Sequence, residues 1–214
     1  MKTDQLIDIL GATFEPADRG KTRRALLGAM VAGAAVAFVA MLVVLGPRPE
    51  ATAMPREGFI LLKLLFTLGV VALAAIFLFV LARPTVGRLK SIVLVAAPFA
   101  VVVAAAFVVL GRAPPRDWGG MIIGTECVTC LLAIPLLSVA PFAALVWALR
   151  KWGAPTDLAG AGAVVGLVAG GLGATAYAFH CPDDSVAFVA TWYGITIGLC
   201  TFVGARLGPR LLRW

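Results

Sequence analysis

The stretch FILLKLLFTLGVVALAAIFLFVLA at residues 59–82 contains one charged residue, Lys63, in 24 positions. About 20 apolar residues in a helix cross the roughly 30 Å hydrocarbon core of a bilayer. Lipid offers no partner for backbone N–H and C=O groups, so a segment of this kind must satisfy them internally as a helix. The stretch therefore predicts a transmembrane helix.

The same pattern recurs along the whole chain. The chain contains six apolar spans that begin and end at charged or turn residues. They lie at residues 25–45, 59–82, 91–110, 128–149, 158–179 and 186–205. Hydrophobic residues make up 61% of the 214 positions and charged residues 14%, against roughly 25% charged residues in soluble domains. We predict an all-α integral membrane protein, in which residues 25–214 form a bundle of six transmembrane helices. Short connections favour three hairpins of sequential helices.

Small and kinking residues within the spans predict how the helices pack. Gly162, Gly166 and Gly170 recur every four residues, which lets two helix backbones approach closely in lipid. We interpret this repeat as a packing surface rather than a ligand site. Pro98, Pro135 and Pro141 lie inside spans and are expected to kink them, because neighbouring helices can compensate the lost hydrogen bond.

The basic residues are divided unequally between the two ends of the spans. Of 18 Lys and Arg residues, thirteen belong to one side: Lys2, Arg19, Lys21, Arg23, Arg24, Arg83, Arg88, Lys90, Arg150, Lys151, Arg206, Arg210 and Arg213. The other five are Arg48, Arg56, Lys63, Arg112 and Arg116. Because basic residues accumulate in cytoplasmic loops, we expect both termini to be cytoplasmic. Topology and contact with anionic membrane lipid then account for the net charge of +7 without a nucleic-acid partner.

Amphipathic residues near the span ends are expected to contact the membrane interface. Trp118, Trp152, Trp192, Tyr193 and Trp214 lie close to predicted boundaries, where aromatic belts form. Lys63 lies near the outer start of its span. We expect its amine to reach the headgroups, with a structural ion pair as the alternative.

The first 24 residues form a polar tail that lacks the short apolar core of a signal peptide. Thr3 is a plausible N-cap for a short helix. Leu6, Ile7 and Leu10 share one face of that helix, and Asp4 and Asp8 lie on the polar side. Such a short helix is marginal alone in water, so a docking partner is expected to order it. A protein partner is favoured over the membrane surface because interfacial helices are usually basic; an idle leader is the remaining alternative.

Three of the four cysteines lie at span ends that this topology places outside. Cys127 and Cys130 form a Cys-x-x-Cys at the start of the fourth span, and His180 and Cys181 lie between the last two spans. Together these four residues could bind zinc, cadmium or another soft metal ion tetrahedrally. The thiols could equally form a regulated disulfide, or a constitutive one that stabilises the bundle. Cys200, deep in the sixth span, is expected to be a small buried apolar residue.

Several function classes lack support in the residues. No nucleophile, base and orienting group form the pattern of an active site, so we do not expect an enzyme. A membrane thiol-disulfide oxidoreductase is nevertheless compatible with the outer cysteines. A small metal transporter is the other alternative, although its pathway would place ionisable or thiol groups near the midplane, where only Cys200 is available.

Five short motifs, in this order, give the chain a family resemblance. They are Met1-Lys2-Thr3-Asp4-x-Leu6-Ile7, Lys63-Leu64, Glu126-Cys127-x-x-Cys130, the loop His180-Cys181-Pro182-Asp183-Asp184-Ser185 running into Trp192-Tyr193, and the terminal Leu211-Leu212-Arg213-Trp214. The chain resembles the NrsF family of six-helix bacterial inner-membrane anti-sigma factors. The resemblance implies that the cytoplasmic tail holds an extracytoplasmic-function sigma factor at the membrane. It also implies that periplasmic cysteines detect heavy metal or oxidative stress, with Cys130 and Cys181 as the sensing pair and Cys127 as a third candidate.

Joining the two observations gives a mechanistic hypothesis. The tail helix binds the sigma factor through Leu6, Ile7 and Leu10, with Asp4 and Asp8 at the rim of the contact. Metal binding or oxidation at the outer cysteines then shifts the helices from one packing arrangement to another. We expect no obligatory cofactor. A coupling of about 1–3 kcal/mol between sites would change sigma-factor affinity by about 5–150-fold.

Overall fold

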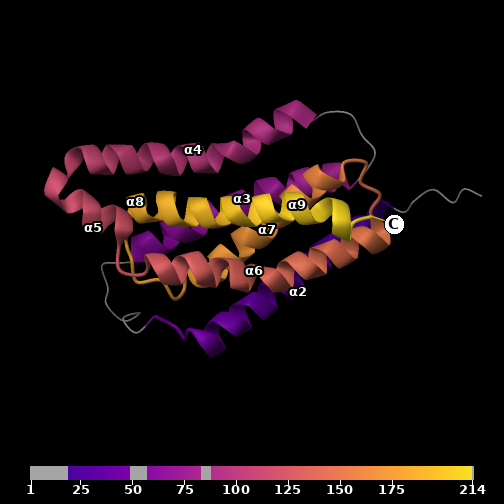
Figure 1. The fold of residues 1–214 in the computed structure, drawn as a ribbon, viewed down its shortest axis with the longest axis horizontal. Coiled ribbons are helices and arrows are strands. Elements are labelled where there is room, and N and C mark those ends of the chain that lie inside the picture. Colours follow the sequence, from indigo (N-terminus) through magenta and orange to yellow (C-terminus); the bar gives the residue numbers. More distant parts are fainter. Residues whose placement is uncertain (1–18, 49–56, 83–87, 214) are drawn as a thin grey trace, which may run out of the picture.

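The computed structural model describes residues 19–48, 57–82 and 88–213 (Figure 1). Every regular element in these ranges is a helix. The long helices are α2 (Arg19–Val44), α3 (Glu57–Leu81), α4 (Arg88–Arg112), α6 (Cys127–Trp152), α7 (Leu158–Tyr177) and α9 (Gly194–Leu211). Short elements join them: the 3-10 turn η1 (Pro115–Asp117), α5 (Trp118–Ile123), α8 (Val186–Phe188) and the π-helical turn η2 (Val189–Tyr193).

Six helical segments are long and apolar enough to cross a membrane, which confirms the predicted fold class. Large apolar side chains on the outer helices remain uncovered: Leu65 on α3 is 78% exposed and Phe107 on α4 is 71% exposed. Water would penalise such exposure, whereas lipid tails cover it without cost. The chain is therefore a multi-pass membrane protein.

Helix α7 lies at the centre of the bundle. The most apolar part of α7 is 72% buried inside the protein, compared with 11% for α4. Its most extensive contact is with α9, and it also packs against α6, α3 and α2. A helix rich in glycine and alanine can occupy this place because its thin side chains let four neighbours approach its backbone.

The repeat of Gly162, Gly166 and Gly170 forms the surface of α7 that contacts α9. A Cβ atom on Gly166 would overlap the carbonyl oxygen of Cys200 and would lie 3.1 Å from the Cα atom of Thr201. At Gly162 the obstructing groups are the backbones of two glycines of α9. The prediction of close backbone packing at this repeat is confirmed.

The neighbours of the first helices differ from three sequential hairpins. Helix α9 pairs with α7 as expected, but α2 packs mainly against α6 and α7, and α3 packs mainly against α7 and α4. Glycines allow both placements. A Cβ atom on Gly171 of α7 would lie 2.6 Å from the Val71 side chain of α3, and a Cβ atom on Gly33 of α2 would overlap the backbone of Pro141 in α6.

The bundle has two distinct ends. At one end, which we name the terminal end, the Thr22 hydroxyl near the start of α2 donates a 2.7 Å hydrogen bond to the Trp152 carbonyl at the end of α6. The end of α9 lies there too, opposite α5 and α8 (Figure 1). The other end, which we name the loop end, carries residues 46–48, 113–126 and 180–185. Both ends of the described chain therefore lie at the terminal end.

Several helix boundaries differ from the sequence prediction. Helix α2 begins at Arg19 rather than residue 25, and the last helix continues to Leu211 rather than residue 205. Basic residues are favourable in the last turn of a helix, which explains why α9 continues through Arg210. Residues 115–123 form η1 and α5 instead of a plain loop, fixed in part by the Trp118 indole N–H, which donates to the Leu110 carbonyl at 2.9 Å.

Candidate functional site

The cysteines of the loop end are free thiols in a buried cluster. Cys130 lies in the first turn of α6 and Cys181 lies in the loop between α7 and α8, and both are fully buried. Tyr177 and Tyr193 are fully buried in the same core. Cys127, at the first position of α6, is only partly buried. The structure thus brings Cys130 and Cys181 together from elements far apart in sequence, with Cys127 nearby.

The surroundings of Cys181 keep its thiol protonated. Burial raises the pKa of the Cys181 thiol, and the neighbouring Lys63 ammonium offsets part of that rise. The Tyr193 hydroxyl faces the sulfur, a weak acceptor, and has no nitrogen or oxygen partner among the described residues. Tyr193 is therefore a buried neighbour of the thiol, and its assignment to the membrane interface is wrong.

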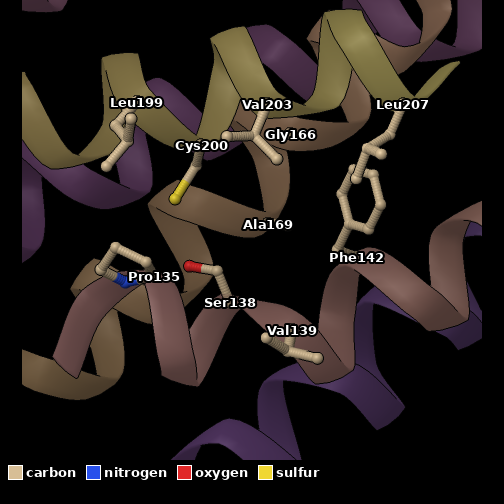
Figure 2. Close-up of a pocket in the computed structure, with 10 residues that line it drawn as sticks. All are labelled: Pro135, Ser138, Val139, Phe142, Gly166, Ala169, Leu199, Cys200, Val203 and Leu207. Carbon is tan, nitrogen blue, oxygen red and sulfur yellow. The ribbon is translucent and has the colours of Figure 1, made fainter. Parts of the chain in front are cut away.

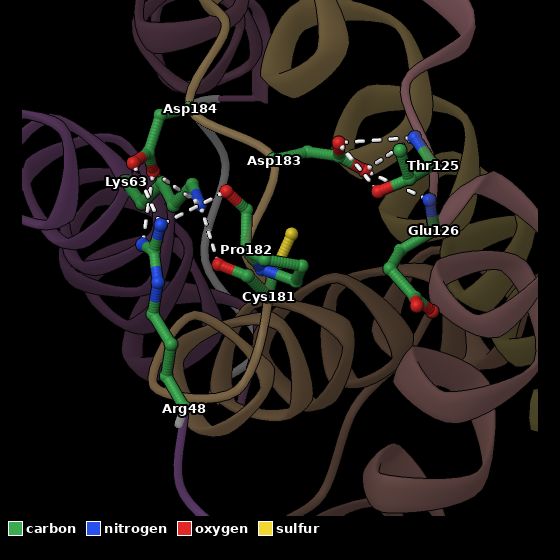
Figure 3. Close-up of polar contacts among 8 residues, drawn as sticks. All are labelled: Arg48, Lys63, Thr125, Glu126, Cys181, Pro182, Asp183 and Asp184. Atoms are coloured by element: carbon green, nitrogen blue, oxygen red, sulfur yellow. Dashed lines mark hydrogen bonds and ion pairs between the residues drawn. The ribbon is translucent and has the colours of Figure 1, made fainter. Parts of the chain in front are cut away.

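Lys63 does not reach the headgroups. Its side chain is fully buried, and its Nζ donates to the Cys181 carbonyl at 3.0 Å and to the Asp184 carboxylate at 3.3 Å (Figure 3). An ammonium inside a bundle needs such partners, because an isolated charge in apolar surroundings is costly. The expectation that Lys63 reaches the lipid headgroups is wrong, and the structural ion pair is confirmed.

Asp184 joins Lys63 to Arg48, which follows the end of α2. The Arg48 guanidinium donates to both carboxylate oxygens of Asp184, at 2.9 and 3.1 Å, and to the Pro182 carbonyl at 3.0 Å. Partial burial tends to raise the pKa of Asp184, but the hydrogen bonds and charges of Arg48 and Lys63 outweigh it and hold that pKa below its usual value. The carboxylate is therefore ionised and bound on two sides.

The preceding residue, Asp183, binds the start of α6. Its carboxylate accepts hydrogen bonds from the backbone N–H groups of Thr125 at 3.0 Å and Glu126 at 2.8 Å, and from the Thr125 hydroxyl at 3.0 Å. These N–H groups precede the first turn, where an anion is favoured by the helix dipole. Gly124 permits the approach: it has φ +61°, and a Cβ atom there would lie 2.7 Å from an Asp183 oxygen.

His180 binds a backbone group rather than the cysteines. Its Nδ1 lies 3.0 Å from the Gly46 carbonyl oxygen, so this nitrogen carries the proton and donates it. Among the described residues no group of three or more His, Cys, Asp or Glu side chains is arranged to hold a metal ion. The four-ligand set of Cys127, Cys130, Cys181 and His180 does not fit a tetrahedral metal ion in this conformation. Soft-metal binding by the thiols stays a prediction.

Cys200 lies away from this cluster, on a cavity between α6, α7 and α9 (Figure 2). The cavity has a volume of about 270 Å³ and an almost entirely apolar lining, in which Ser138 is the hydroxyl-bearing side chain. Ser138 satisfies its own hydroxyl by donating to the Ile134 carbonyl at 2.6 Å. Cys200 is partly rather than fully buried, and otherwise behaves as the small apolar residue that we expected.

Some residues of this site could be predicted from the sequence and others could not. Lys63, His180 and the cysteines were predicted, but no role was expected for Arg48 or for the two aspartates. Charges inside a membrane are usually paired. A lysine inside one span and two adjacent carboxylates in a short loop between other spans could therefore have predicted the ion pair. The tail residues Asp4, Leu6, Ile7, Asp8 and Leu10 lie outside the described residues, and their role stays a prediction.

Comparison with known proteins identifies the family. Residues 10–214 match the family model NrsF, described as "Negative regulator of sigma F". The chain belongs to the NrsF family. It is 33% identical to the "Probable anti-sigma-F factor NrsF" of Azospira oryzae and 33% identical to the "Anti-sigma-F factor NrsF" of Caulobacter vibrioides, over the full length of each chain. No solved structure is significantly similar to this NrsF-family chain.

The family assignment indicates a regulatory role for the protein that contains the loop-end cluster. NrsF proteins are anti-sigma factors, which are regulators rather than enzymes, and an anti-sigma factor implies a sigma factor as partner. In this chain Cys127, Cys130, Cys181 and the ion pairs of Asp184 lie at the loop end, whereas α2 begins at the terminal end. The two features therefore lie at opposite ends of the bundle.

Proposed function

We propose that this chain is an inner-membrane anti-sigma factor that holds an extracytoplasmic-function sigma factor through its N-terminal segment. Membership of the NrsF family over residues 10–214 carries the proposal. In the bound state Leu6, Ile7 and Leu10 bury their apolar face on the sigma factor, and Asp4 and Asp8 contact its basic rim. Burial on the partner orders a helix that is too short to be stable alone.

The proposed orientation places the terminal end in the cytoplasm. The described basic residues at that end include Arg23, Arg24, Arg150, Lys151 and Arg210, and cytoplasmic loops concentrate Lys and Arg. The contact between Thr22 and the Trp152 carbonyl supports this grouping, because it joins the start of α2 to the α6 end that carries Arg150 and Lys151. The loop end then faces the periplasm, an oxidising compartment.

The sensing role in this proposal belongs to Cys130 and Cys181, with Cys127 as a third thiol. A peroxide would oxidise the two thiols to one disulfide, accepting two electrons and leaving as two molecules of water. A soft cation such as cadmium would instead displace the thiol protons and bind the thiolates. Because Cys181 is buried and protonated at rest, the cluster is inert until such a signal arrives.

Either reaction would change the packing of the loop end. Cys130 belongs to α6 and Cys181 to the loop at residues 180–185, so a covalent bond or a shared ion fixes one element against the other. A coupling of about 1–3 kcal/mol, typical of allosteric proteins, would lower sigma-factor affinity by about 5–150-fold. That range is sufficient to release the sigma factor to RNA polymerase.

Co-purification from detergent-solubilised membranes tests the binding role. We expect the full chain to retain a protein that mass spectrometry identifies as an extracytoplasmic-function sigma factor, and a chain lacking residues 1–18 to lose it. Leu6→Asp should also lose the sigma factor. Gln5→Asp introduces the same charge on the opposite side of the predicted helix and should retain it. Equal retention of the sigma factor by the full chain and the truncated chain would refute binding through the N-terminal segment. Retention by neither chain would refute the anti-sigma role and favour a thiol oxidoreductase, which needs no tail.

A further inference from the structure

The loop at residues 180–185 contacts α3, the residues that follow α2 and the residues that precede α6 through two adjacent carboxylates. Asp184 turns to one side of the loop, toward Arg48 and Lys63, and Asp183 turns to the other side, toward Thr125 and Glu126 (Figure 3). Cys181 lies between these two sets of contacts. The loop that carries Cys181 is therefore bonded to Arg48 after α2 and to Lys63 of α3 on one side, and to the residues that precede α6 on the other.

We propose that Asp183 and Asp184 form a two-armed latch through which a change at Cys130 and Cys181 is passed to α2. The proposal rests on the proposed function, because α2 is the helix that leads into the N-terminal segment. It assigns to Arg48, Lys63 and the two aspartates a positioning role that is separate from the thiol chemistry. With the latch closed, α2 is held against the loop and the tail is presented to the sigma factor.

The contacts of Asp184 with Arg48 and Lys63, which we call the Asp184 arm, favour two states, either fully formed or fully broken. Lys63 is fully buried, and the Asp184 side chain is only 10% exposed. A buried charge that loses its partner must find water or become neutral, so intermediate positions are unfavourable. Lys63 also donates to the carbonyl of Cys181 itself, which ties the backbone of the sensing residue directly to α3. Movement of Cys181 therefore displaces an acceptor of Lys63 directly.

The Asp183 arm prevents the loop from absorbing the change elsewhere. Asp183 holds the loop against the start of α6, the helix that carries Cys130. Both thiols lie in a close-packed core, which has little free volume for adjustment. Joining the sulfurs draws the loop further toward α6, and the displacement must be taken up where the loop leaves α2 and α3.

Three contacts link the latch to residues 46–48, which follow the end of α2 at Val44. The Arg48 guanidinium binds Asp184, the Arg48 backbone N–H donates to the Phe179 carbonyl at 3.3 Å, and His180 donates to the Gly46 carbonyl. Helix α2 leads into these residues and is a single helix of 26 residues, so a displacement at its end is passed along its length. At the far end the Thr22 hydroxyl donates to the Trp152 carbonyl of α6.

The test compares Asp184→Asn and Lys63→Met with Asp117→Asn in the full chain under reducing conditions. Asp117 is the matched control, because its carboxylate lies at the same end but makes only an exposed ion pair with Arg116 at 3.8 Å. One readout is retention of the co-purified sigma factor. The other is the rate at which a maleimide labels Cys181, measured by mass spectrometry relative to the partly exposed Cys127.

We expect Asp184→Asn and Lys63→Met to label Cys181 at least about tenfold faster than the parent, because opening of the loop exposes it. Both should release the sigma factor at least about fivefold more readily without oxidant, the lower limit of typical coupling. Asp117→Asn should match the parent. Added diamide, a thiol oxidant, should release no more sigma factor from Asp184→Asn. It should still act on Gly166→Ala, in which α7 and α9 are destabilised but the latch is intact.

Failure of the latch and failure of the proposed function give different results. If the parent and Asp184→Asn retain the sigma factor alike and protect Cys181 alike, the latch is refuted and the proposed function stands. If the parent itself retains no sigma factor, both are refuted. If Asp184→Asn and Lys63→Met do not fold, Arg48→Gln leaves the Lys63 pair in place and takes their role, with parent-like behaviour as the refuting result.

Discussion

Substituting Gly166 by alanine tests the central packing contact of the bundle. Alanine normally stabilises a helix by about 1 kcal/mol relative to glycine. At Gly166 the new methyl would overlap the Cys200 carbonyl oxygen and lie 3.1 Å from the Thr201 Cα atom. Overpacking costs about 1–3 kcal/mol, and the upper value applies because backbone atoms cannot rotate away. The net loss is about 2 kcal/mol, which lowers Tm by about 4–8 °C in a chain of this size.

Gly198 provides the matched control for this prediction. It lies on α9, and a Cβ atom there would have no neighbour within 4 Å. Gly198→Ala should therefore leave the stability unchanged or raise it by up to about 1 kcal/mol. Thermal unfolding of both variants in the same detergent, followed by intrinsic tryptophan fluorescence, gives the comparison. A Gly166→Ala protein that melts at or above the parent temperature would refute the account of α7 and α9 packing.

Three further predictions follow from the loop end. Burial raises the pKa of Cys181, so its alkylation should be slow at neutral pH and should accelerate only above the pH range in which an ordinary thiol ionises. An alkylation rate that levels off near pH 9 would contradict this prediction. The pKa of Asp184 is lowered in the folded protein, so the stabilisation by its carboxylate is present above the ordinary carboxyl pKa and is lost as pH falls through the lowered value. The free energy of unfolding of Asp184→Asn should therefore depend less on acidic pH than that of the parent. Trp192→Phe removes the indole donor to the Ile122 carbonyl at 2.9 Å and should cost about 1 kcal/mol in thermal unfolding, whereas an unchanged Tm would show that this bond contributes nothing.

The six spans could be predicted because their signal is local. Length and hydropathy alone decide whether a segment crosses lipid, and every predicted span corresponds to a helix of the structure. The boundaries were less predictable where polar residues continue a helix. The helices α2 and α9 include Arg19 and Arg210. A long basic side chain such as that of Arg210 can extend to the membrane surface while its backbone remains helical.

The arrangement of the helices could be predicted only in part. The glycine repeat in α7 predicted a close helix contact but did not reveal its partner, which the structure identifies as α9. Sequence order suggested that α2 pairs with α3, whereas α2 packs mainly on α6 and α3 packs mainly on α7. The choice depends on which surfaces fit each other, and this information is spread over all the helices rather than held in one of them.

The candidate site could likewise be predicted only in part from the sequence. Cysteine spacing and span ends placed Cys130 and Cys181 at one end of the bundle, and the structure brings them into one buried cluster. The partner of Lys63 was not predictable, because Asp184 is separated from it by four helices in the chain. Tyr193 was misassigned since an aromatic residue near a span end can face either lipid or core, and only packing against Tyr177 and Phe188 decides this.

The most direct test of the account is release of the sigma factor in response to a thiol signal. The parent and the double variant Cys130→Ser/Cys181→Ser are prepared with bound sigma factor, and each is treated with diamide or with cadmium. The account predicts that the parent releases the sigma factor by at least about fivefold, whereas the double variant retains it. Equal release from both proteins would show that these buried thiols do not carry the signal.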